Sequence, residues 1–241
     1  MIIHFKDPTL KMRRRVPVLE DIVALNDRIV AGLAAIQGFW AADKGPADAI
    51  FDPPVINEDR DGSAGLDICE CLAPGLLGYI SYNSRPLPQY VKDKAMDDDF
   101  MGIAVSPTKV DRAQFFGDTL PQILHVFEAY RAGFQTDKDA ILDEDFDRKQ
   151  ELSDYGRGRD IDGRDSVYRI WPVNYFDERL CQRAYGMSAA EVVRRAAPHC
   201  HSARLVNGGA YLIVTLDIVS GADALNALHN RIATQLSADL L

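Results

Sequence analysis

The sequence contains few cysteines, no long apolar segment and fewer basic than acidic residues. No stretch approaches the roughly 20 apolar residues that a membrane-spanning helix needs, so we expect no membrane partner. The opening residues MIIHFKDPTLKMRRR carry their basic cluster after a short apolar run, which is the reverse of a secretory signal peptide. We therefore expect a cytoplasmic protein, in which four thiols stay reduced and form no disulfide framework: Cys69, Cys71, Cys181 and Cys200.

The shortage of positive charge limits the classes of partner. The 241 residues include 36 acidic and 27 basic side chains, and the formal net charge is −9. Such a surface repels a phosphate backbone unless its basic residues are segregated. We therefore expect no nucleic-acid partner and favour a basic protein partner. With 47% hydrophobic residues the chain can bury a sizeable core, and its length fits a single domain over residues 1–241.

Motifs of known catalytic sites are also missing. The sequence has no G-x-S-x-G elbow, no G-x-G-x-x-G fingerprint and no Walker loop. The glycines of residues 156–163, GRGRDIDG, lack the preceding strand and the apolar helix start of a phosphate-binding loop. We predict that the chain is not an enzyme and has no catalytic residue and no cofactor. The alternative is a small metal-dependent hydrolase that uses the Asp, His and Cys clusters.

Four short clusters resemble metal sites. DRDGS at 59–63 and DIDGRD at 160–165 are similar to the start of a calcium loop, which needs a bidentate Glu at its twelfth position. That position is Trp171 in the second loop and falls inside a predicted strand in the first. HCH at 199–201 and CEC at 69–71 lack the usual spacing of structural zinc ligands. We predict turns and thiols here, and no metal.

The spacing of apolar residues predicts strands mixed with helices in no regular alternation. This pattern is typical of the α+β class, with amphipathic helices packed on a mostly antiparallel sheet. We predict amphipathic helices within residues 16–40, 117–134 and 222–236, and a solvated helix followed by a loop within the polar tract 137–165. We predict strands at 2–5, 101–107 and 166–171, a broken extended segment at 49–56, and hairpins over 66–84 and 203–219.

The sequence pattern of residues 171–199 predicts two short helices with a sharp break between them. Asn174 or Asp177 can cap the first helix, and Gly186 can take the left-handed conformation that ends it. Ser188 and Glu191 form an S-x-x-E capping box for the second helix. The sequence therefore marks the ends of both helices.

A DNA-reading helix-turn-helix is an alternative interpretation of this pair. The two helices could cross closely only if a small residue stood four positions before the glycine, and Gln182 stands there. Cys181 lies on an apolar stripe of the first helix, so we expect a buried and unreactive thiol. Four arginines could contact phosphates, yet the chain as a whole is acidic: Arg179, Arg183, Arg194 and Arg195.

The segment PVNYFDERLCQRAYGMSAAEVVRR, followed by NGGAYLIV, resembles the C-terminal half of immunity-protein-52 family members. These are small bacterial proteins encoded beside toxins of polymorphic and type VI secretion systems. The matching positions are a Pro-Val lead-in, a Leu-Cys helix, an aromatic-Gly stop and a Gly-Gly-aromatic hairpin: Pro172, Val173, Tyr175, Leu180, Cys181, Tyr185, Gly186, Gly208, Gly209 and Tyr211.

The resemblance implies an α+β inhibitor without catalytic residues, which neutralises a nuclease toxin that has a restriction-endonuclease-like domain. A basic DNA cleft attracts an acidic inhibitor, so acid clusters with a neighbouring phenylalanine are candidates for toxin binding, although solvated loop charge is the alternative reading. The sequence leaves the toxin, the mode of inhibition and the oligomeric state, a homodimer included, open. The candidate toxin-binding residues are Asp97, Asp98, Asp99, Phe100, Asp143, Glu144, Asp145, Phe146 and Asp147.

Overall fold

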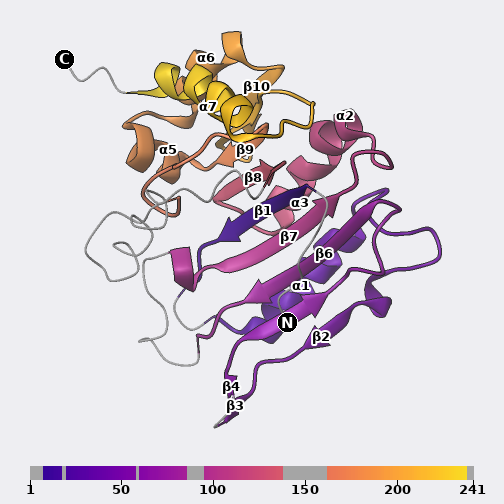
Figure 1. Ribbon diagram of the computed structural model, residues 1–241. Helices are drawn as coiled ribbons and strands as arrows, with labels where there is room; N and C mark the ends of the chain where they lie inside the picture. The colour runs from indigo at the N-terminus through magenta and orange to yellow at the C-terminus, as the bar shows by residue number, and fades with distance from the viewer. Residues whose placement is uncertain (1–7, 18–19, 58–59, 86–94, 138–161, 238–241) are drawn as a thin grey trace. The chain divides into compact units, whose positions relative to one another are not determined.

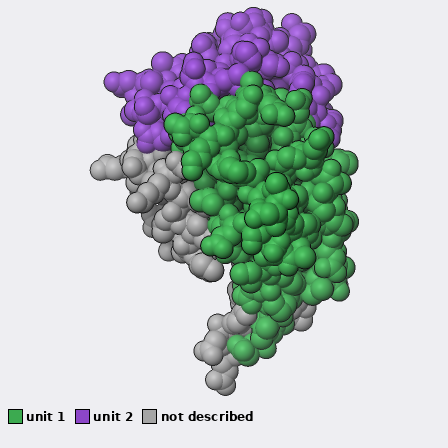
Figure 2. Space-filling view, turned by 90° about the vertical axis from the view of Figure 1, so that its right-hand side faces the viewer, with its two compact units in different colours: residues 1–93, 97–129 green, residues 94–96, 130–241 purple. Residues whose placement is uncertain are grey.

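The computed structural model describes residues 8–17, 20–57, 60–85, 95–137 and 162–237. The chain divides into two compact units, coloured green and purple in Figure 2: unit 1 is Met1–Asp93 with Asp97–Ala129, and unit 2 is Lys94–Met96 with Tyr130–Leu241. Antiparallel strands and helices occur in both units, so the predicted α+β class is confirmed. That residues 1–241 form one domain stays a prediction.

Unit 1 contains an antiparallel sheet with α1 packed on one of its faces (Figure 1). Its strands follow the order β1 (Thr9–Arg14), β7 (Asp99–Val105), β6 (Leu76–Tyr82), β5 (Ala64–Asp67) and β2 (Ile50–Asp52). A small hairpin pairs β3 (Ile56–Asn57) with β4 (Arg60–Asp61). The helices are α1 (Ile22–Ala34), α2 (Arg112–Gln114) and α3 (Leu120–Val126), with a π-helical segment at Phe115–Thr119.

The two faces of this sheet differ in polarity. Met12, Met101 and Ile80 are cross-strand neighbours and are almost fully buried. The Tyr82 hydroxyl donates a hydrogen bond of 3.1 Å to Asn26 Oδ1 on α1, so the helix covers this face. Strand residues alternate between the faces, and the opposite face carries the exposed Leu77. The helix face is therefore the core of unit 1, and the other face is open among the described residues.

The first helix begins later than its sequence predicts. The sequence predicts a helix from residue 16 onward, with Pro17 suited to its first turn. In the structure the Asp21 carboxylate accepts hydrogen bonds from the N–H groups of Val23 and Ala24, and α1 starts at Ile22. A side chain that satisfies two otherwise unpaired N–H groups is a stronger start signal than a proline. The prediction of the helix is confirmed, and its predicted start is wrong.

The strands of unit 1 follow the predictions in part. The predicted strand at 2–5 lies outside the described residues, while β1 forms from a basic stretch in which Leu10 and Met12 are buried. The predicted hairpin over 66–84 is confirmed, with Leu66 opposite Ile80. Its first strand ends at Asp67, whose carboxylate accepts a hydrogen bond of 2.8 Å from Cys69 N and turns the chain. The predicted strands at 49–56 and 101–107 are present as β2, β3 and β7.

The predicted helix at 117–134 is wrong in its second half. α3 ends at Val126, and Glu128 has a positive φ of 53° that turns the chain. Residues Arg131–Gln135 then form β8, in which Ala132 lies opposite Tyr175. The apolar residues of this stretch fit a helical period and a buried strand equally well, and tertiary pairing decides between them.

Unit 2 has an antiparallel sheet and a helical layer of its own. Leu212 on β11 and the helix residues Leu180, Val192 and Ile232 belong to one buried cluster. The strand order is β10 (Ser202–Val206), β11 (Gly209–Ile213), β9 (Val173–Phe176) and β8. The helices are α5 (Glu178–Tyr185), α6 (Ala189–Ala196) and α7 (Ala222–Leu236), the last as predicted at 222–236.

The helix pair of residues 171–199 is confirmed with its caps. Asp177 accepts a hydrogen bond of 2.7 Å from Leu180 N, Gly186 has φ of 68°, and Ser188 Oγ accepts from Glu191 N at 3.2 Å. The strand predicted at 166–171 is absent from this described segment, because side chains take its backbone groups. His229 Nδ1, for example, accepts a hydrogen bond of 3.0 Å from Ile170 N.

The predicted hairpin at 203–219 is also confirmed. Asn207 and Gly208 have φ of 50° and 78°, and Val206 lies opposite Gly209. Positive φ at both central residues is the type I′ geometry, which matches the twist of the flanking strands. A Cβ on Gly209 would lie 2.6 Å from the Phe176 carbonyl oxygen. The two glycines are therefore needed for different reasons, one for its φ and the other for a close backbone approach.

Candidate functional site

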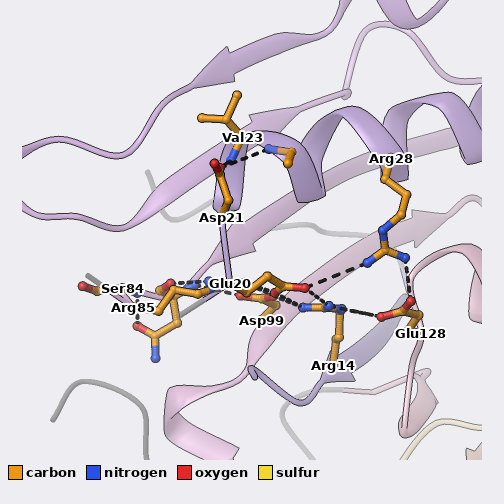
Figure 3. A network of polar contacts seen from close by, with 11 residues as sticks. Arg14, Glu20, Asp21, Val23, Arg28, Ser84, Arg85, Asp99 and Glu128 are labelled. Carbon is orange, nitrogen blue, oxygen red and sulfur yellow. Dashed lines mark hydrogen bonds and ion pairs between the residues drawn. The ribbon is translucent and has the colours of Figure 1, made fainter. Parts of the chain in front are cut away.

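Asp99, one of the predicted toxin-binding acids, is buried in the interior of unit 1. Its side chain has no exposed surface, and its Oδ2 accepts hydrogen bonds from Arg14 Nη1 at 3.0 Å and Arg85 Nη2 at 2.6 Å (Figure 3). Its Oδ1 accepts from Asn83 N at 3.0 Å. This carboxylate is engaged on both oxygens, so it organises the interior of unit 1.

Asp99 belongs to a network of three arginines and three carboxylates. Glu20 contacts Arg14 through two hydrogen bonds, of 2.7 and 2.5 Å, and also accepts from Arg85 at 3.1 Å. Glu128 accepts from Arg14 and, at 2.5 Å, from Arg28. Arg14, Arg28 and Arg85 balance Glu20, Asp99 and Glu128, so the formal charge of the network is zero.

The network joins segments that are distant in the sequence. Arg14 ends β1, Glu20 precedes α1, Arg85 follows β6, and Glu128 follows α3. Burial raises the pKa of Glu20, but the hydrogen bonds and positive charges of Arg14 and Arg85 outweigh it, and the net pKa lies below the ordinary value. Glu20 is thus ionised and paired, whereas burial raises the pKa of Asp99 above its ordinary value in spite of the same arginines. The network as a whole ties these segments of unit 1 together.

The other predicted binding acids are placed differently. Asp97 is half-buried at the end of a short 3-10 turn, and Asp98 is buried. Phe100 is half-buried beside Tyr79, with ring centroids 5.6 Å apart. The cluster Asp143, Glu144, Asp145, Phe146 and Asp147 lies outside the described residues. A role of any of these residues in toxin binding stays a prediction.

A groove of about 410 Å³ lies on the open face of the sheet in unit 1. The pairing register places Ile50, Asp67 and Tyr79 in one row across β2, β5 and β6. The neighbouring row is Asp52, Gly65 and Ser81, in which Gly65 contributes no side chain. Gly65 therefore forms the floor of the groove, and its sides are the carboxylates of Asp52 and Asp67, the Tyr79 ring and Ile50. Neighbouring residues of a strand point to opposite faces, so Asp67 lies on the face opposite to Leu66, and the register brings it beside β2.

The cysteines are protonated thiols at neutral pH. Cys181 is fully buried, as predicted, and burial raises its pKa to about 12. Burial likewise raises the pKa of Cys69 to about 12 and that of Cys200 to about 11. A thiol needs its thiolate form to act as a nucleophile. Within the described ranges, no three His, Cys, Asp or Glu side chains are grouped as metal ligands would be.

Carboxylates pair with several arginines of the α5–α6 helices. Glu191 accepts hydrogen bonds of 2.7 Å from both Arg194 and Arg195, and Arg183 forms an ion pair of 2.7 Å with Asp165. These positive charges are therefore offset locally. A DNA-reading role for the pair stays an untested alternative.

The chain is similar in fold to a solved structure. No protein-family model matches the chain, and no curated protein matches it. The structure of the Pseudomonas aeruginosa T6SS protein PA0821 is similar, with a TM-score of 0.50 and 10% sequence identity, over 96% of this chain and 76% of that one. The two chains therefore share a fold. Within the described residues, no helix has the length and apolar character needed to cross a membrane.

Proposed function

We propose that this protein is an immunity protein that binds and neutralises a nuclease toxin of a type VI secretion system. The observation that carries the proposal is the shared fold: the similar structure is that of a T6SS protein, and the similarity extends over 96% of this chain. The resemblance of residues 172–211 to immunity-protein-52 members supports the same role. Fold alone does not specify function. The proposal therefore also requires that the charge and the surface of the chain suit the binding of a nuclease toxin.

The charge supports a basic partner. A nuclease must attract DNA and therefore has a basic cleft, and this chain has a net charge of −9. Complementary charge raises association rates from about 10⁵–10⁶ to about 10⁸–10⁹ M⁻¹s⁻¹. A cell that makes a lethal nuclease needs such fast capture, and also slow release. We expect a Kd in the nanomolar range or below, equivalent to about −12 kcal/mol.

In this proposal the protein acts by binding and not by catalysis. The thiols are protonated, the arginines and carboxylates of the buried network neutralise one another, and the helix pair of unit 2 packs its apolar stripe into a core. The exposed acids and apolar side chains of unit 1 are left to contact the toxin. The open sheet face of unit 1 is then the leading surface for binding, and the acid clusters at 97–100 and 143–147 stay predicted contacts.

The test uses a candidate toxin, the product of a gene that neighbours the gene of this chain and encodes a nuclease domain. The purified toxin is assayed for cleavage of plasmid DNA while the immunity candidate is titrated in. A stoichiometric inhibitor stops cleavage at a fixed molar ratio, whereas an enzyme that inactivates the toxin does so at far lower amounts. Co-expression should also restore growth of a host that makes the toxin. Full cleavage in the presence of excess protein would rule out the proposal.

A further inference from the structure

The groove on unit 1 is hollow because of where its glycines and aromatic ring lie. A Cβ on Gly65 would come no closer than 3.7 Å to any neighbour, here the Ile80 carbonyl oxygen, so the space above it is open. A Cβ on Gly102 would lie 2.8 Å from Tyr79 Cε1, which places the Tyr79 ring over that glycine. Tyr79 therefore leans away from Gly65 and forms one wall of the groove.

The side chains around this space combine negative charge with apolar surface. Asp67 is oriented by its hydrogen bond from Cys69 N, and Asp52 belongs to the adjacent row on β2. Ile50 is 70% exposed at the edge of the groove, the largest exposed fraction of any large apolar side chain in the described residues. Phe51, between Ile50 and Asp52, packs inward against Tyr82 and anchors β2, with ring centroids 6.4 Å apart.

We propose that this groove receives a lysine or arginine side chain of the toxin, an inference that rests on the proposed function. The charged end of such a side chain would pair with Asp52 and Asp67, while its aliphatic stem would cover Ile50 and the Tyr79 ring. An exposed isoleucine with an aspartate in its own row and another in the neighbouring row combines apolar contact with charge complementarity, as an interface anchor needs.

The geometry favours an organic cation over a metal ion. Calcium and magnesium sites in proteins take several oxygen ligands in a small sphere, and within the described part of the chain no three acidic, histidine or cysteine side chains are grouped in that way. The groove volume of about 410 Å³ lies at the lower end of the range for ligand clefts, roughly 300–1,000 Å³. A lysine or arginine side chain of a docked protein therefore fits inside it.

Two variants test the groove by different means. The double variant Asp52→Asn, Asp67→Asn removes the charges and keeps an oxygen acceptor for Cys69 N. Gly65→Val fills the hollow and changes no charge, and its β-branched side chain suits a strand. The matched charge control is Asp27→Asn, Asp43→Asn, which alters two exposed acids of unit 1 away from the groove. The matched glycine control is Gly45→Val, at a position with no neighbour within 4 Å.

The Kd for the adjacent-gene toxin is measured by titration calorimetry at low and moderate salt, with thermal melting to confirm that each variant is folded. We expect the double variant to raise Kd at least about thirtyfold, because it removes one side of an interfacial charge pair. Its Kd should also depend less on salt than that of the unmodified protein. Gly65→Val should raise Kd at least about tenfold, and both controls should leave it within about twofold.

The outcomes separate this inference from the proposed function. If the unmodified protein neutralises the toxin and both groove variants bind it as tightly as their controls do, the groove is not the docking site and the inference is wrong, while the function stands. If the unmodified protein does not bind the toxin at all, the proposed function fails and the inference fails with it. A loss of affinity in only the groove variants supports both.

Discussion

Arg14 and Asp99 are cross-strand partners on β1 and β7, and their side chains form an ion pair of 3.0 Å in the interior of unit 1. Removing one member of a buried pair costs about 3–5 kcal/mol, and the lower end of this range applies here because Arg14 keeps Glu20 and Glu128 as partners. Asp99→Asn also deprives Arg85 of a carboxylate. We therefore expect this variant to lose about 3 kcal/mol or more of unfolding free energy in urea denaturation.

The matched control is Asp27→Asn, the same change on the exposed side of α1. Surface substitutions of this kind usually stay within about 0.5 kcal/mol of the unmodified protein. If Asp99→Asn proves as stable as Asp27→Asn, the network does not hold unit 1 together, and the buried carboxylate would need another explanation.

The network also predicts a loss of stability in acid. Although burial opposes it, pairing with Arg14 and Arg85 lowers the folded-state pKa of Glu20, and pairing with Arg28 and Arg14 lowers that of Glu128. A carboxyl group whose pKa is lower in the folded state contributes stability that is present above its ordinary pKa of 4.5 and is lost as the pH falls through the lowered value. These two groups should therefore make the urea midpoint drop as the pH is taken from 6 towards 3, while Asp99, whose pKa is raised by burial, contributes in the opposite direction.

The variant Glu20→Gln isolates this contribution. Its urea midpoint should be lower than that of the unmodified protein at pH 6. The difference should shrink as the pH falls below 4.5, because the unfolded state then binds a proton more readily than the folded state does. A difference that stays constant over this range would show that the effect of Glu20 is one of packing and not of ionisation.

Local signals in the sequence predicted the helix pair and the last hairpin of unit 2 well. The helix pair has a capping Asp177, a left-handed Gly186 and an S-x-x-E box, and each acts within a few residues of itself. Asn207 and Gly208 specify their turn in the same way. Such features are readable from a single sequence because the chain needs no distant partner to adopt them.

Features that depend on distant partners were not predictable from the sequence. The sequence predicts that the acids at 97–99 lie on the surface. In the structure Asp99 is buried and pairs with Arg14, 85 positions earlier in the chain. The stretch after Val126 has a helical period but becomes a strand because Ala132 meets Tyr175 on β9. The groove likewise exists only in the register that sets Asp52 beside Gly65. In each case the deciding contact is tertiary.

Cys181 should resist chemical modification in the folded protein. Its side chain is fully buried, burial raises its pKa to about 12, and its Sγ donates to the Phe176 carbonyl oxygen at 3.6 Å. Both the lack of access and the lack of thiolate slow alkylation. Iodoacetamide at pH 7.5, followed by peptide mass spectrometry, should label Cys181 in urea but not under native conditions. Equal labelling in both conditions would mean that the thiol is accessible and that its place in the core is wrong.

Gly209 should tolerate no side chain, although its neighbour Gly208 is the residue with positive φ. A Cβ at Gly209 would lie 2.6 Å from both the Phe176 carbonyl oxygen and Tyr175 Cε2, and β11 would have to move away from β9. Forcing a methyl group into a packed site typically costs about 1–3 kcal/mol, so Gly209→Ala should lower the melting temperature of the protein by several degrees. Gly45→Ala, where the added methyl meets open space, is the control and should melt as the unmodified protein does. If the two variants have the same melting temperature, the β9–β11 contact is looser than its geometry implies. The Gly-Gly-aromatic pattern would then be required only for the turn between β10 and β11.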